Sequence, residues 1–212
     1  FCGTLARAYH RKSGTSGKSG TRAAVVVAAA CLLAGCAQRT PADGWARVEA
    51  ADLGPAGQAQ YAAARDARDA MFRELMTTLS AEFERAGPAS AIAVCRDEAR
   101  RIAADTAARH GVAIGRTSWK LRNSANVPPP WAASLLAERP EEPRIAASAD
   151  GRLGVTLPIR LAAGCLACHG PAETLRSDVR DALASQYPDD RATGFQVGAL
   201  RGWFWVEVPP DR

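Results

Sequence analysis

Cys165-Leu166-Ala167-Cys168-His169 is the stretch that says most about this chain of 212 residues. Two cysteines separated by two residues and followed at once by a histidine are typical of a c-type haem attachment site. In such a site the two thiols bind the haem vinyl groups and the histidine imidazole ligates the iron. The sequence therefore predicts one covalent haem c, held by Cys165 and Cys168, with His169 as an axial ligand.

Two other uses of a Cys-x-x-Cys pair compete with the haem site. The pair can be half of a zinc site, which needs two further nitrogen or sulfur ligands. His110 and Cys95 could provide these ligands only through long-range folding. A thioredoxin-type dithiol opens a helix within a βαβ pattern, and no such pattern surrounds Cys165. Both comparisons favour the haem.

The first 35 residues have the composition of a secretory signal. They contain five basic and no acidic residues and include an apolar stretch at positions 23–34. That stretch is shorter than the about 20 residues that span a bilayer as a stable helix. It runs into Leu33-Ala34-Gly35-Cys36, which resembles the lipobox of bacterial lipoproteins. We expect a lipoprotein signal peptide over residues 1–35 and acyl chains on Cys36; an ordinary signal peptide with an incidental cysteine is the alternative.

Localisation and charge follow from this leader. Ala37 follows the lipid cysteine, which by resemblance to Gram-negative sorting favours the outer membrane. The expected location is the periplasmic side of the bacterial envelope, with membrane contact through the lipid. The whole chain carries a net charge of +5, but residues 36–212 hold 22 basic and 22 acidic residues. The basic character therefore belongs to targeting, and we expect no nucleic-acid partner.

Cys95 is the cysteine that neither the leader, the lipid nor the haem accounts for. It lies in a segment, residues 89–110, whose pattern predicts a helix. Ile92, Cys95, Ala99 and Ile102 fall on one apolar stripe of that helix, so Cys95 is expected to point into the core. It is then either the second axial ligand of the iron or a small buried hydrophobe.

Other candidates for the second axial position are few. Met76 lies on the stripe Phe72, Met76, Leu79 and Phe83 of an earlier predicted helix, and Met often partners His in cytochromes c. Such a stripe is also the ordinary pattern of a core. His110 precedes Gly111, where an interaction with the last helix carbonyls is expected. An open position for a gas or substrate is a further alternative.

The remaining chain predicts one domain behind a short tether. Residues 36–57, rich in Ala, Gly and Pro, are expected to be a flexible tether, and residues 58–208 a single haem c domain. A long helix at 58–85 is ended by Gly87-Pro88. The other expected elements are a strand at 112–121, a helix at 131–138, a hairpin at 144–161, a helix at 177–185 and a final strand within 195–208.

The segment from Arg116 to Asn123 is dense in hydrogen-bond donors. A charge run of this kind is often one solvated strand face. Buried carboxylates, however, need cationic or hydrogen-bonding partners. Arg116, Lys120 and Arg122 are therefore candidates to bind the two haem propionates.

Several separated motifs occur in an order that resembles a bacterial haem-binding family with a PAS-like fold. This family was long catalogued as a domain of unknown function and is described from a cyanobacterial c-type haem protein. The motifs are Ala91-Ile92-Ala93-Val94-Cys95, Arg116 to Asn123 with Asn126 and Pro128, Leu157-Pro158-Ile159, Cys165 to Gly170, Tyr187 to Phe195, and Gly198-Ala199-Leu200-Arg201-Gly202.

The resemblance implies an α+β fold, with a PAS-like antiparallel sheet, flanking helices and a long N-terminal helix. It also implies iron ligation by His and Cys, which on this chain means His169 and Cys95. A thiolate ligand donates strongly to iron and lowers its reduction potential.

The functional expectation is single-electron transfer, or sensing of redox state or a small gas, with an unidentified redox or signalling partner. A peroxidase-like haem enzyme is the alternative; it needs an open distal pocket with a general base, for which His110 is the best candidate. A folded envelope lipoprotein whose haem is only structural is a third interpretation. A redox or sensor protein is favoured over an enzyme.

Overall fold

The computed structural model describes residues 44–210. The predicted signal peptide, the lipid cysteine Cys36 and the first part of the predicted tether lie outside these described residues. The described part contains a five-stranded sheet, a long helical hairpin and a group of short helices around the haem motif. The predicted α+β class, with an antiparallel sheet, flanking helices and a long N-terminal helix, is confirmed.

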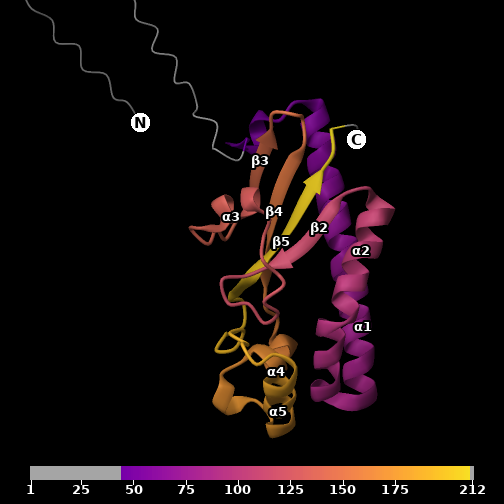
Figure 1. The fold of residues 1–212 in the computed structure, drawn as a ribbon, viewed down its shortest axis with the longest axis vertical. Coiled ribbons are helices and arrows are strands. Elements are labelled where there is room, and N and C mark those ends of the chain that lie inside the picture. Colours follow the sequence, from indigo (N-terminus) through magenta and orange to yellow (C-terminus); the bar gives the residue numbers. More distant parts are fainter. Residues whose placement is uncertain (1–43, 211–212) are drawn as a thin grey trace, which may run out of the picture. The chain divides into compact units, whose positions relative to one another are not determined.

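The sheet is antiparallel throughout, in the order β1-β3-β4-β5-β2 (Figure 1). Its strands are β1 (Trp45–Val48), β2 (Ala113–Thr117), β3 (Arg144–Ser148), β4 (Leu153–Arg160) and β5 (Leu200–Val208). The predicted hairpin is β3 and β4, turning at Asp150 and Gly151. β5 lies between β4 and β2 and therefore joins the hairpin to the strand that follows the helices.

Strand β5 shows why the sheet has two apolar faces. Successive side chains on a strand point to opposite faces. Phe204 and Val206 accordingly join the large core beneath the helices, whereas Trp203 and Trp205 join a tryptophan-rich cluster on the other face. Because both faces are covered, residues 203–206 of the strand form a continuous apolar run.

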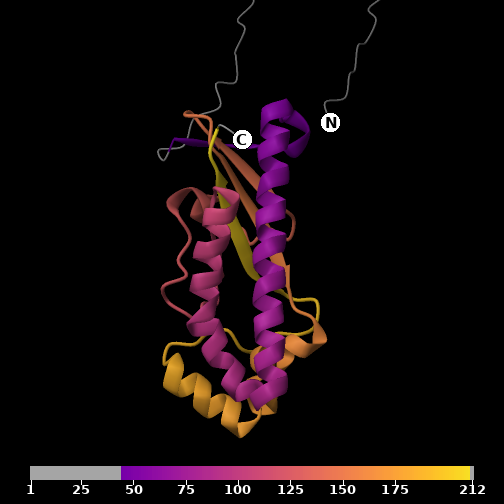
Figure 2. The same ribbon diagram turned by 90° about the vertical axis from the view of Figure 1, so that its right-hand side faces the viewer.

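The large core is covered by a helical hairpin. Helix α1 spans Pro55–Arg96, but Gly87 interrupts it with φ 83° and ψ 177°, as the Gly87-Pro88 pair predicts. After this kink the chain turns back along itself and continues into α2, Glu98–His110 (Figure 2). The predicted helix at 89–110 is thus divided at Asp97. The hairpin reaches beyond the sheet, and its far end helps to enclose the haem motif.

The other face carries helix α3, Pro130–Leu136, and the tryptophan-rich cluster. The Trp131 ring stacks on that of Trp45 at 5.2 Å and donates a hydrogen bond to Glu207. The same ring lies against the backbone of β4, where a Cβ on Gly154 would be 2.7 Å from it. Glycine at this position therefore lets α3 approach the sheet closely.

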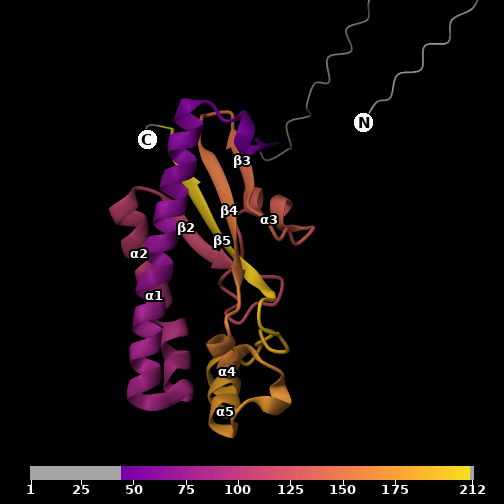
Figure 3. The ribbon, with the colours of Figure 1, turned by 180° about the vertical axis from the view of Figure 1, so that it is seen from behind.

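The haem motif lies at the end of the sheet, between β4 and the last helix. Cys165 closes the 3₁₀ turn Ala163–Cys165, and α4 spans Leu166–His169. Helix α5, Ser177–Gln186, then packs with Val179 and Leu183 against Ile92 of the helical hairpin. Figure 3 shows α4 and α5 together at the end of the molecule, next to the turn of the hairpin.

The predicted tether, residues 36–57, is wrong in its second half. Trp45 begins strand β1, which pairs with β3, and its side chain is only 7% exposed. Helix α1 begins at Pro55, a residue well suited to the first helical position. The Ala, Gly and Pro composition gave no sign of strand β1 or of the start of helix α1. Trp45 is the main buried apolar side chain of this segment, and a single tryptophan makes no periodic pattern.

Candidate functional site

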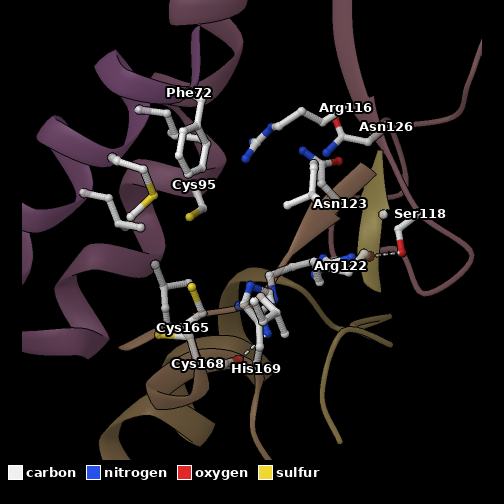
Figure 4. Close-up of a pocket in the computed structure, with 18 of the residues that line it drawn as sticks. Phe72, Cys95, Arg116, Ser118, Arg122, Asn123, Asn126, Cys165, Cys168 and His169 are labelled. Atoms are coloured by element: carbon white, nitrogen blue, oxygen red, sulfur yellow. Dashed lines mark hydrogen bonds between the residues drawn. The ribbon is translucent and has the colours of Figure 1, made fainter. Parts of the chain in front are cut away.

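One cavity opens between the helical hairpin and the lower end of the sheet (Figure 4). It encloses about 1370 Å³ of empty space, counted out to its open mouth. This volume includes open solvent at the mouth, so the chemistry of the site is defined by the side chains that line it. Cys165, Cys168 and His169 all line it, and so do Cys95, Met76, Arg116 and Arg122.

His169 presents a free ring nitrogen to this cavity. Its Nδ1 lies 2.7 Å from the carbonyl oxygen of Ala192, so Nδ1 carries the proton and donates it to that oxygen. The other nitrogen, Nε2, is then an unprotonated lone pair. This is the arrangement in which a histidine binds metal, with the second nitrogen fixed by a backbone carbonyl.

Burial keeps His169 neutral. Desolvation, followed by the charges of Arg122 and Arg201, lowers the pKa of His169 to about 3. The imidazole is therefore available as a neutral ligand at any physiological pH. Burial also raises the pKa of the Cys168 thiol. Cys95, Cys165 and Cys168 are free cysteines, so no disulfide competes for them.

A segment that we call the clasp, residues 190–195, holds the haem motif from behind. Besides the Ala192 carbonyl, the clasp donates two backbone hydrogen bonds, from Gly194 to Gly170 and from Phe195 to His169. The Phe195 ring meets the His169 ring edge to face at 6.3 Å. The clasp thus fixes both the main chain and the side chain of the histidine.

Two of the three basic residues predicted to bind propionates have other partners. The Arg122 guanidinium pairs with Asp190 at 3.1 Å and donates to the carbonyl of Cys168 at 2.6 Å. Lys120 is not among the residues that line the cavity; its Nζ donates to the carbonyl of Thr193 at 3.1 Å and lies 5.0 Å from the centre of the Phe195 ring. The density of donors in the sequence could not separate these structural roles from binding.

Arg116 is the basic residue that fits a ligand. Among the described residues, none forms a hydrogen bond or ion pair with its side chain, and burial lowers its pKa. Part of its surface remains exposed because it faces the hollow of the cavity. Figure 4 shows Arg116 beside Asn123 and Asn126, whose amides add uncharged donors to the same wall.

Sequence reasoning missed Arg201 as a site residue. It lies at the start of β5 and lines the cavity, and its Nη1 donates to the carbonyl of Lys120 at 3.1 Å. Burial, followed by the charges of Arg122 and Arg116, lowers its pKa to about 10. The signal was present in Gly198-Ala199-Leu200-Arg201-Gly202, where a lone cation stands between small and apolar residues.

The opposite wall is apolar and belongs to the helical hairpin. All four residues of the predicted stripe line the cavity: Phe72, Met76, Leu79 and Phe83. At the surface, Phe72 is 44% and Phe83 40% exposed. Cys95 projects into the cavity from the same hairpin, with His169 across the space from it (Figure 4). Cys95 and Met76 therefore both line the cavity into which His169 faces.

His110 does not reach the cavity. It ends α2, and among the described residues it is not part of the lining. The best sequence candidate for a peroxidase-type base is therefore separated from the haem motif. In residues 44–210, no group of three or more His, Cys, Asp and Glu side chains is arranged to hold a metal ion. None of the helices described has the length and apolar character needed to cross a membrane.

Comparisons with known proteins agree with the expected resemblance. A family model described as Tll0287-like matches residues 49–209 of the chain. Among solved structures, the crystal structure of the cyanobacterial heme-protein Tll0287 matches with a TM-score of 0.51 and 26% sequence identity. The match covers 74% of this chain and 97% of that chain. No match was found among curated proteins.

Arg116 and Arg122 are expected to have opposite effects on the stability of protein produced without haem attachment. Arg122→Met should destabilise the fold by about 3–5 kcal/mol, because Asp190 is left buried without its cation. Arg116→Met should raise stability by on the order of 1 kcal/mol, because an unpaired desolvated charge is removed. Urea unfolding of both variants beside the unchanged chain measures this, and equal losses would contradict the division of roles.

Proposed function

The chain belongs to the Tll0287-like family, and we propose that it is a c-type haem protein that exchanges single electrons at the bacterial envelope. One observation supports this most strongly. Cys165, Cys168 and His169 line one cavity, and the histidine already presents an unprotonated Nε2 to it. The family relation and the likeness to a haem protein support the cofactor.

The residues of the site fit a covalent haem. The thiols of Cys165 and Cys168 would attach it through its vinyl groups, and His169 would ligate its iron. The stripe at Phe72 and Met76 provides an apolar wall that excludes water from the ring. When bound, a haem supplies one reversible electron, and its potential is set by its ligands and surroundings.

Arg116 and Arg201 are the proposed partners of the propionates. Both line the cavity and neither has a carboxylate partner among the described residues, whereas Arg122 has Asp190. Asn123 and Asn126 add hydrogen-bond donors on the same wall. Two carboxylates placed there would relieve the cost of two partly desolvated cations.

The mouth of the cavity supports electron exchange. Phe72 and Phe83 line the cavity and are also partly exposed, so a redox partner could approach a bound haem from this side of the helical hairpin. Sensing is the second candidate, because both Cys95 and Met76 line the cavity and could exchange as ligands.

The envelope location is part of the same proposal. Covalent attachment of haem to thiols suits a compartment outside the cytoplasm, and Cys36 follows a lipobox-like sequence. An acylated Cys36 would hold the domain at the membrane surface, with each buried CH₂ adding about 0.8 kcal/mol.

A pyridine haemochrome spectrum tests the central proposal. Protein matured in cells that assemble c-type cytochromes should give a c-type spectrum with one haem for each chain. Replacing Cys165 and Cys168 together by alanine should abolish retention of haem after acid-acetone extraction, because no thioether bond remains. Haem-free wild-type protein from such cells would refute the proposal.

The second axial ligand is tested by two matched variants. Cys95→Ala should shift the Soret band and raise the midpoint potential, because a strongly donating thiolate is lost. Met76→Leu removes the other candidate ligand and nearly preserves the side-chain volume. It should leave the Soret band and the midpoint potential unchanged. The reverse pattern would assign the ligand to Met76.

The lipid anchor is tested separately. Cys36→Ser should move the protein from the membrane pellet to the soluble periplasmic fraction, since the acylated side chain is lost. The serine variant should keep its haem spectrum. Retention of Cys36→Ser in the membrane fraction would argue for an ordinary signal peptide and another mode of attachment.

A further inference from the structure

A buried ion pair lies directly behind the haem motif. Arg122 and Asp190 are joined by two contacts, from Nη2 at 3.1 Å and from Nε at 3.2 Å, both to Oδ2. Their side chains are only 7% and 9% exposed. A buried pair of this kind is weak evidence for stability, because desolvation of both charges offsets their attraction. Its position next to the histidine points to another role.

The pair and the histidine share one acceptor. The carbonyl oxygen of Ala192 accepts from Nδ1 of His169 at 2.7 Å and from Nη2 of Arg122 at 3.2 Å. Asp190 holds the same residue from its other side, since its Oδ1 accepts from the backbone N–H of Ala192 at 2.8 Å. Arg122 also donates to the carbonyl of Cys168 at 2.6 Å. The residue that accepts the side-chain hydrogen bond of His169, Ala192, is therefore also held by both members of the ion pair.

We propose that Arg122 and Asp190 are positioning residues that set the reduction potential of the site in opposite directions, Arg122 raising it and Asp190 lowering it. This inference rests on the proposed function, since it concerns an iron ligated by His169. Among the described residues, Arg116 and Arg201, the proposed partners of the propionates, do not share a hydrogen-bond acceptor with His169 as Arg122 does.

The first effect of Arg122 acts through the shared carbonyl. An oxygen that already accepts a hydrogen bond from a cation is a poorer acceptor for the Nδ1 proton. The imidazole then keeps more of that proton and donates less electron density to a metal at Nε2. A weaker donor stabilises ferric iron less, so the reduced state is favoured.

The second effect is the charge itself. Reduction adds one electron to the iron, breaks no bond and lowers the local charge by one. A fixed cation in a poorly solvated site favours that change, and a fixed anion opposes it. Arg122 is already felt at the ring, where its charge is one of the causes that disfavour protonation of His169. Asp190 offsets Arg122, so removing either partner exposes the other.

The test is a potentiometric titration of the haem-loaded protein with dithionite and redox mediators. Arg122→Gln should lower the midpoint potential and Asp190→Asn should raise it. Each equilibrium constant for reduction should change roughly tenfold, which corresponds to about 59 mV for one electron. Arg122→Lys should retain much of the wild-type potential, since it keeps the charge.

The double variant Arg122→Gln with Asp190→Asn removes both charges, so neither is left buried without its partner. It should therefore fold even if the single variant Arg122→Gln does not. Its potential should lie between those of the two single variants. The Soret and haemochrome spectra should match wild type in all four proteins, because the ligands are unchanged.

Two outcomes would overturn the inference by itself. One is a shift of both single variants in the same direction, which would mean that the pair only clamps the loop. The other is an Asp190→Asn protein whose potential falls or does not move. A wild-type protein without covalent haem would overturn the proposed function, and this inference with it; the wild-type spectrum separates that failure from the first two.

Discussion

The hydrogen bond from His169 Nδ1 to the Ala192 carbonyl is the interaction on which the rest of the site depends. It determines the tautomer of the imidazole and therefore which nitrogen faces the cavity. The acceptor belongs to the clasp, a loop without regular secondary structure, so it needs support of its own. Asp190 holds the N–H of Ala192 and Arg122 its carbonyl, and both are buried. The orientation of the His169 ring is thus secured by one ion pair and a few backbone hydrogen bonds.

The fold supplies two walls of contrasting chemistry around this bond. The helical hairpin contributes an apolar wall, and it reaches the haem motif only because Gly87 turns α1 back beyond the end of the sheet. The strands and the loop after β2 contribute cations and amides, with Arg116 and Arg201 facing the hollow. An amphipathic ligand with a flat apolar ring and two carboxylates matches both walls at once. The unpaired cations cost stability in the chain alone, as functional groups commonly do.

Local patterns in the sequence predicted the parts of this molecule that local physics determines. The Cys-x-x-Cys-His spacing, the Gly87-Pro88 break and the stripe that carries Cys95 all reflect contacts within one or two turns of chain. The tether was misjudged because burial of Trp45 depends on Trp131, far away in the sequence. The internal ion pair of Arg122 could not be predicted for the same reason. Its partner Asp190 lies 68 positions away, and a run of cations looks the same whether it binds a ligand or an internal carboxylate.

The cations around the site and the proposed Cys95 thiolate would have opposite effects on the reduction potential of a bound haem. A Cys95 thiolate would hold the potential low, because it donates strongly to iron. Arg116, Arg122 and Arg201 all line the cavity and would favour the reduced state of a bound haem, whereas Asp190, which pairs with Arg122, would oppose it. Propionates bound by Arg116 and Arg201 would cancel two of these charges. Arg122 and Asp190 would then remain as the fixed charges nearest the histidine, which is why a change in either should be visible in the potential while the spectrum stays the same.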